Sequence, residues 1–164
     1  MSWSDCRRYI VLLVAATLLT ACGFRMQGAE RFPAMFANTY VETSDDYTLF
    51  YRQLAIELEQ GDIKLVESAV DASAVIRIES DESGQRILTI SAFNVPTEYE
   101  VFYRIRYSVW QDGVEILPQQ SLGFTQSYTF DPTLVLGKNR EGEEIREALA
   151  LRLARQVSRQ LALL

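Results

Sequence analysis

The chain has 164 residues, with 16 Lys or Arg, 22 Asp or Glu and no His, so its formal net charge is −6. This length fits a single domain with a substantial core. The acidic balance argues against nucleic acid as a partner, because phosphate binding needs an excess of Lys and Arg. The missing His excludes Ser-His-Asp and Cys-His catalysis and every His-ligated metal site, and we expect no metal and no other cofactor.

The first residues have the layout of a secretory signal peptide. Arg7 and Arg8 are followed by an apolar run over residues 9–19, which is too short to span a bilayer, since spanning takes about 20 apolar residues. The end of this segment, Leu19-Thr20-Ala21-Cys22, resembles the lipobox of bacterial lipoproteins. In such proteins the Cys thiol is acylated and the peptide bond before it is cut. Cys22 is therefore the expected lipidation site.

The lipobox sets the expected boundaries of the chain: residues 1–21 are a signal peptide, 22–33 a lipidated N-terminal tether and 34–164 a single domain. Loss of the signal removes one acidic and two basic residues, so the charge of −6 becomes −7. It also removes Cys6, which leaves the mature protein with no free thiol and no disulfide. Gly23 after the Cys favours, by the same resemblance, export to the outer membrane.

The first half of the domain reads as strand, helix and strand. Residues 35–43 favour a strand, and an apolar residue at every third or fourth position predicts an amphipathic helix over 46–60. Capping side chains occur at 43–46, and Gly61 fits the position just past the end of the helix. A short strand is expected at 63–66.

Four strands with alternating apolar residues should follow, over residues 74–80, 85–94, 98–111 and 119–130. Asp81-Glu82-Ser83-Gly84 predicts a turn between the first two, and Asp112-Gly113 predicts a tight hairpin after the third. The alternation is clearest in the third strand, where six residues share one face: Tyr99, Val101, Tyr103, Ile105, Tyr107 and Val109.

Asp131-Pro132 should end the last strand, and a polar loop should lead to a final helix over about 141–163. The apolar seam of this helix contains Ile145, Leu149, Leu153, Val157 and Leu161. Because strands run together rather than alternating with helices, the order indicates an α+β fold. We expect two helices packed on one face of a mainly antiparallel sheet of about four strands.

Catalytic signals are weak, and we expect no enzyme. The sequence lacks a nucleophile elbow, a P-loop and a C-x-x-C motif. Its paired carboxylates fall at predicted helix starts, in a turn and at the edge of a strand, where ordinary structural roles explain them. These pairs are Asp45 with Asp46, Asp81 with Glu82, Glu98 with Glu100, and Glu143 with Glu144.

Basic residues form three groups. Arg104 and Arg106 share the polar face of the long strand with Phe102 and Trp110, a face that a two-layer domain leaves uncovered and that therefore suggests a partner surface. Lys138 and Arg140 lie in the predicted loop, where two cations near apolar side chains could bind a lipid phosphate. The last helix carries a stripe that we interpret as solvated charge, partly paired with Glu143, Glu144 and Glu147 of the same helix: Arg152, Arg155 and Arg159.

Three stretches make the chain similar to the LptE family of lipopolysaccharide-assembly lipoproteins: residues 19–28, 47–65 and 128–138. The resemblance implies two helices on a four-stranded sheet and a non-enzymatic plug inside the LptD β-barrel of the outer membrane. It also implies lipopolysaccharide binding, and Lys138 matches the loop Lys of the family. Arg140 matches less well, since the family often has an acidic or amide residue there. With Arg104 and Arg106, these residues are the candidate lipopolysaccharide contacts.

The resemblance thus predicts a lipid-anchored outer-membrane protein on the periplasmic side, inside a partner barrel. A second class stays open, because auxiliary lipoproteins of ABC or MCE-type lipid transport systems, and lipoprotein partners of secretins, also combine a Cys-Gly start with a small α+β domain. Co-purification with one very large β-barrel protein would distinguish the first class from the second.

Overall fold

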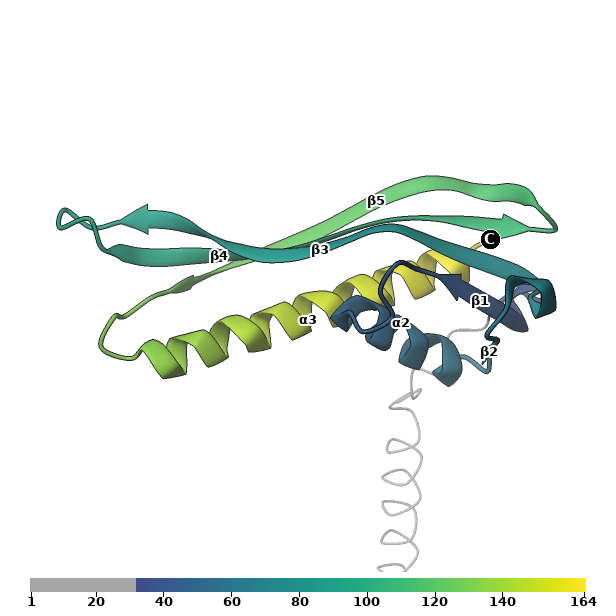
Figure 1. Cartoon of the computed structure of the whole chain (residues 1–164), viewed down its shortest axis with the longest axis horizontal. Coiled ribbons are helices and arrows are strands. Elements are labelled where there is room, and N and C mark those ends of the chain that lie inside the picture. The colour runs from purple at the N-terminus through teal and green to yellow at the C-terminus, as the bar shows by residue number, and fades with distance from the viewer. Residues whose placement is uncertain (1–31) are drawn as a thin grey trace, which may run out of the picture.

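The computed structural model describes residues 32–164 (Figure 1). The predicted signal peptide, Cys22 and nearly all of the tether lie outside these residues. The elements follow in the order η1 (Ala34–Phe36), β1 (Asn38–Glu42), α2 (Leu49–Gln60), β2 (Lys64–Leu65), η2 (Ala69–Asp71), β3 (Ala74–Ile90), β4 (Pro96–Gln111), β5 (Val114–Thr129) and α3 (Val135–Leu161).

The strands form one five-stranded sheet in the order β2-β1-β3-β4-β5. β1 is parallel to β2 and β3, whereas β3, β4 and β5 form an antiparallel meander. Among residues 32–164, both α-helices lie on the same face of the sheet and the other face carries no helix (Figure 1). The predicted α+β class with two helices on one face is confirmed, and the sheet has five strands rather than about four.

The turn expected at Asp81–Gly84 is wrong, because these residues run through the middle of β3. Asp81 pairs with Ile105 and Gly84 with Phe102, and a register shift between Ile78 and Ser80 marks a bulge. Gly84 serves cross-strand packing rather than a turn: a Cβ there would lie 2.8 Å from the ring of Phe102. The predicted strands 74–80 and 85–94 are therefore one strand.

Several other boundaries also shift. α2 begins at Leu49, because Thr48 accepts the Tyr51 N–H at 3.1 Å and caps the helix. β5 begins at Val114, directly after the predicted Asp112-Gly113 hairpin, whose two residues have positive φ angles of 50° and 77°.

The last helix begins at Val135 rather than near residue 141. The Lys138 N–H already donates to the Leu134 carbonyl at 2.9 Å. Asp131 accepts the Thr133 N–H at 2.8 Å, which closes the preceding turn and aims the chain into the helix. Lys138 and Arg140 are therefore helical, and the prediction that they lie in a loop is wrong.

The core fills the space between the sheet and the helices. The alternation predicted for β4 is confirmed, since the inward residues from Val101 to Val109 are buried, and the seam of α3 is buried from Ile145 to Leu161. α2 contributes three fully buried side chains, Phe50, Leu54 and Leu58. Each such side chain contributes roughly 1.5–3 kcal/mol by leaving water.

A polar contact inside this core fixes the start of α2. The Phe50 N–H has no partner within its helix and donates to the Tyr103 hydroxyl at 3.0 Å. Burial raises the pKa of Tyr103, as does the neighbouring Asp81 carboxylate. Burial likewise raises the pKa of Asp81, although hydrogen bonds from Thr48 and Tyr103 act in the opposite direction.

Replacing Tyr103 by Phe should destabilise the fold by about 1–3 kcal/mol, because the buried Phe50 N–H would lose its acceptor. Urea unfolding of the wild type and the variant measures this difference. Tyr47→Phe is the matched control, because Tyr47 is 84% exposed and its loss of a hydroxyl should have almost no effect. Equal losses in the two variants would contradict the role of the Tyr103 hydroxyl.

Asp81 should make stability depend on pH. Its pKa is higher in the folded protein than in the unfolded chain, so the folded state binds this proton more tightly. Protonation of Asp81 therefore contributes fully to the free energy of unfolding below the unfolded pKa of about 3.9. This contribution is lost as the pH rises through the raised pKa of the folded state. Asp81→Asn removes this loss.

The free energy of unfolding of Asp81→Asn should thus rise relative to wild type as the pH increases through this window, and urea unfolding at a series of pH values measures it. The exposed Asp71 provides the control substitution, Asp71→Asn. A difference between Asp81→Asn and wild type that stays constant with pH would show that Asp81 does not titrate in this way.

Candidate functional site

One end of the elongated molecule combines exposed apolar side chains with basic residues. β3 and β4 continue past the first turn of α3, so their connecting turn projects from the body of the protein (Figure 1). This turn is well defined: the Ser91 N–H donates to the Val95 carbonyl at 2.8 Å, and Asn94 takes a positive φ of 59°. The protruding hairpin is therefore an ordered part of the sheet.

Eight large apolar side chains of this region are exposed. They come from the hairpin and from the start of α3, which lie at the same end of the long axis (Figure 1). Phe93 is 89% exposed and Leu136 is 87% exposed. We call this set the apolar end: Ile87, Leu88, Ile90, Phe93, Val95, Leu134, Val135 and Leu136. We take this group of exposed apolar residues as a candidate contact site for an apolar partner.

Lys138 lies beside the apolar end, on the first turns of α3. Its Nζ forms an ion pair with Glu141 Oε2 at 2.7 Å, and only 21% of its side chain is exposed. The ammonium group is thus held in position, but part of its charge is already compensated. Arg140 is exposed, and among residues 32–164 no ion pair involves it.

Tyr128 of β5 docks this part of α3 on the sheet. Its hydroxyl donates to Gln85 Oε1 at 3.4 Å and lies so close to Gly142 that a Cβ there would approach it to 3.1 Å. The ring of Tyr128 stacks on Tyr99 with centroids 5.9 Å apart, and Phe130 packs edge-on against Tyr99 at 5.1 Å. Burial is the main cause that raises the pKa of Tyr128. The part of α3 that carries Lys138 is therefore packed firmly against the sheet.

The structure does not gather the four candidate cations into one place. Arg104 and Arg106 point to the face of the sheet without helices, because they alternate along β4 with the buried core residues. Arg104 lies over the ring of Phe102 at 5.1 Å. Lys138 and Arg140 lie on α3, beneath the opposite face. The predicted cations thus form two separate groups, one on each side of the sheet.

The arginine stripe of α3 has structural contacts. Arg152 lies over the ring of Phe124 at 4.0 Å, and Arg155 Nε binds Glu57 Oε1 at 3.2 Å, which joins α3 to α2. The expected pairing of this stripe with Glu residues of its own helix is wrong for Arg155. Arg159 donates to Gln156 at 2.8 Å within the helix.

The sequence pattern does not predict the apolar end, because residues 85–94 are interpreted only as a strand with alternating apolar residues. A signal was present, since Ile87, Leu88 and Ile90 place apolar side chains on both faces of one strand. Within residues 32–164, no group of three or more His, Cys, Asp or Glu could hold a metal ion. Over the same residues, no helix is long and apolar enough to cross a membrane.

Solved structures of other lipoproteins share this fold. Uncharacterized lipoprotein B from Nitrosomonas europaea matches 85% of this chain and 90% of its own, with a TM-score of 0.71 and 22% identity. The rare lipoprotein B from Shewanella oneidensis matches 76% of this chain and 93% of its own, with a TM-score of 0.66 and 24% identity. These similarities establish the architecture and not the function.

A family model and several sequence relatives point to the same family. The LPS-assembly lipoprotein LptE of Pectobacterium atrosepticum is 27% identical over 94% of this chain and 85% of its own. The protein of the same name from Yersinia pestis is 28% identical over 92% of this chain and 73% of its own. The family model described as "LptE: Lipopolysaccharide-assembly" matches residues 36–161, nearly the whole described fold. The chain therefore belongs to the LptE family.

Proposed function

We propose that this protein is a lipid-anchored lipoprotein on the periplasmic side of the outer membrane that assembles with, and plugs, an LptD-type β-barrel. In this role it takes part in lipopolysaccharide transport and binds lipopolysaccharide at its apolar end. Membership of the LptE family supports the role in lipopolysaccharide assembly. The observation that carries the binding proposal is the exposed apolar end beside Lys138 and Arg140.

Lipopolysaccharide presents anionic phosphates next to acyl chains, and the apolar end offers a partner for each. Acyl chains gain about 0.8 kcal/mol for each CH₂ removed from water, and the exposed side chains from Ile87 to Val95 can cover several such groups. The phosphates need cations, which Lys138 and Arg140 supply at the adjacent start of α3.

The Glu141 carboxylate competes with a lipid phosphate for the ammonium group of Lys138. A phosphate approaching Lys138 has to displace the Glu141 carboxylate, which lies 2.7 Å from the ammonium group. This competition weakens binding but keeps Lys138 in position while the site is empty. Moderate affinity suits a protein that passes a lipid onward rather than retaining it.

The face of the sheet without helices fits a plug in a water-lined barrel. It carries charges of both signs, among them Arg104, Arg106 and the ion pair between Arg86 and Glu100. Such a surface is soluble and can meet the polar wall of a barrel lumen. We therefore assign Arg104 and Arg106 to the barrel contact rather than to the lipid contact at Lys138.

Acylated Cys22 would anchor the domain through the tether of residues 22–33. The ten residue-to-residue steps from Cys22 to Phe32 span at most about 35 Å when extended. Acyl chains at Cys22 would supply the anchoring energy, and two or more chains hold a protein stably at a bilayer. The proposed role requires binding and assembly and no catalytic step.

Lys138→Glu should weaken lipopolysaccharide binding by the unlipidated mature chain at least about tenfold, because it replaces a charge-assisted contact with a repulsive one. Glu141→Gln should strengthen binding, because it removes the competing carboxylate. Fluorescence titration with purified lipopolysaccharide measures both effects. Arg159→Glu is the control, since it makes the same charge change near the other end of α3. Unchanged binding by Lys138→Glu would remove Lys138 from the site.

Cys22→Ser should abolish palmitate labelling of the full-length protein, because the thiol that carries the acyl group is lost.

Affinity purification of the wild type from its own host tests the partner, and we expect one very large outer-membrane β-barrel protein. Depletion of the protein should make lipopolysaccharide accumulate before it reaches the surface. Recovery of an ABC or MCE-type complex instead would overturn the assignment.

A further inference from the structure

A second surface feature lies at the opposite end of the sheet from the apolar end. A groove of about 390 Å³ opens between η2, the start of β3 and the turn that joins β4 to β5. Its apolar wall consists of Trp110, Val70, Val75 and small alanine side chains, and Glu42, Arg77 and Asp112 line its polar side. No residue of the described chain fills it.

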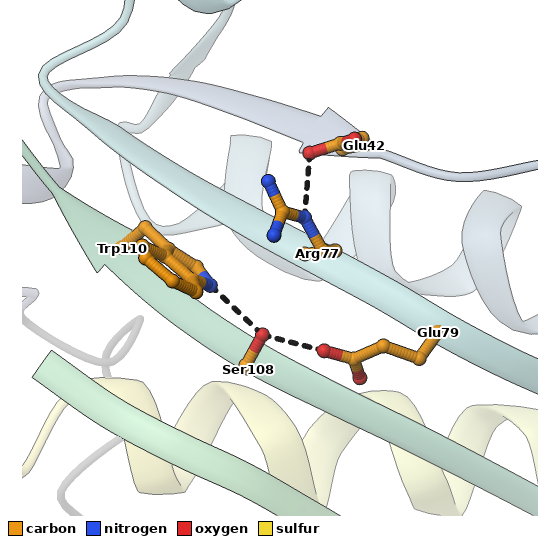
Figure 2. A network of polar contacts seen from close by, with 5 residues as sticks. All are labelled: Glu42, Arg77, Glu79, Ser108 and Trp110. Carbon is orange, nitrogen blue, oxygen red and sulfur yellow. Dashed lines mark hydrogen bonds and ion pairs between the residues drawn. The ribbon is translucent and has the colours of Figure 1, made fainter. Parts of the chain in front are cut away.

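Trp110, in the wall of this groove, is tied into a network of polar contacts (Figure 2). Its indole N–H donates to Ser108 Oγ at 3.0 Å, and the Ser108 hydroxyl donates to Glu79 Oε1 at 2.6 Å. The Arg77 guanidinium lies 5.0 Å from the centre of the Trp110 ring. A partner that contacts a fixed aromatic surface loses little further entropy, which is why such residues are frequent binding hot spots.

Arg77 is itself committed to internal contacts. Its Nε donates to Glu42 Oε2 at 2.8 Å, as Figure 2 shows, while its cationic plane covers part of the indole. The groove therefore has one cation in its lining, and this cation is already compensated by a carboxylate.

The surroundings of the groove are acidic. Asp112 lies in its lining, Asp71 follows the exposed Val70 in η2, and Glu115 is the β5 partner of Trp110 in the sheet register. Val70 is 93% exposed at the edge of the groove and can contact an apolar group there. Apolar walls within an acidic rim fit an apolar side chain that is flanked by positive charges.

We propose that this groove docks a segment of a partner protein in which an apolar side chain is flanked by Lys or Arg. The apolar side chain enters between Trp110 and Val70, and the flanking cations pair with Asp71, Asp112 and Glu115. An anionic lipid surface is disfavoured, because the acidic rim repels it. The groove and the apolar end lie at opposite ends of β3, so the two surfaces can be occupied at the same time.

The chain offers its own reporter for this site. It contains two Trp residues, Trp3 and Trp110, and Trp3 belongs to the predicted signal peptide. Residues 23–164 therefore contain a single tryptophan, and their fluorescence reports on the groove alone.

The probe is a library of peptides of about 12 residues, each with one central Leu, Ile or Phe flanked by Lys or Arg. A matched library replaces the basic residues with Gln. We expect members of the basic library to shift the Trp110 emission and the matched library to bind at least about tenfold more weakly. Raising the salt concentration should reduce the difference, because ions screen charges at an exposed rim.

Two variants locate the contact. Val70→Ser removes the apolar edge, and the double variant Asp71→Lys with Glu115→Lys reverses the rim charge; each should weaken binding at least about tenfold. Glu59→Lys with Asp62→Lys is the charge-matched control, because these exposed residues lie outside the lining of the groove. Circular dichroism checks that all variants fold.

Equal binding of the basic and Gln libraries, or undiminished binding by the rim variant, would overturn the proposal. So would a Trp110 shift produced by phosphatidylglycerol vesicles and not by any peptide, since that result would assign the groove to lipid. Loss of lipopolysaccharide binding in Lys138→Glu leaves the groove unaffected, so the two proposals succeed or fail separately.

Discussion

The unbroken pairing of β3 with β4 determines the shape of this protein. Ladder contacts continue from Val75 opposite Trp110 to Ile90 opposite Pro96, with only local shifts of register. At about 3.3 Å per residue, a strand of 17 residues separates its two ends by about 50 Å. Gly84 lies in the middle of this pairing, where an added Cβ would approach the ring of Phe102 to 2.8 Å. A turn at this position would have produced a shorter, compact sheet without a projecting hairpin.

The helices cover only part of this long sheet, and that partial cover leaves exposed the surfaces that we propose as partner sites. α3 packs along the inward residues of β4 and β5, and Tyr128 fixes its first turns against Gly142. Among residues 32–164 no helix lies beneath the tip of the β3–β4 hairpin (Figure 1). Ile87 and Phe93, which belong to this hairpin, are exposed. No helix of the described chain covers the other face of the sheet, which displays charges of both signs and, at the Trp110 end, the groove. Burial, rather than any catalytic arrangement, thus decides which residues are available to partners.

The sequence was sufficient to predict the elements whose patterns are local. Alternation along β4 and the seam from Ile145 to Leu161 each follow from the period of their own segment, and both are confirmed. The turn predicted at Asp81–Gly84 is wrong because the composition of this segment favours a turn, whereas long-range pairing with β4 holds it extended. Lys138 could be identified as a candidate contact, but its ion pair with Glu141 depends on α3 beginning six residues before the predicted start. The apolar end and the Trp110 groove depend on how segments far apart in the chain meet, which no local pattern records.

The arrangement of these surfaces along the long axis is consistent with the proposed function. β1 pairs with the first residues of β3, from Ala74 to Arg77, so the chain enters the fold at the end opposite the apolar hairpin. In the proposed role, lipid on Cys22 holds this entry end at the inner leaflet. The hydrocarbon core of a bilayer is about 30 Å thick, which is less than the length of β3. A domain standing upright in a barrel can therefore be anchored at one leaflet while its apolar end meets lipopolysaccharide near the other. The length set by the β3–β4 pairing is what makes both contacts possible in one small protein.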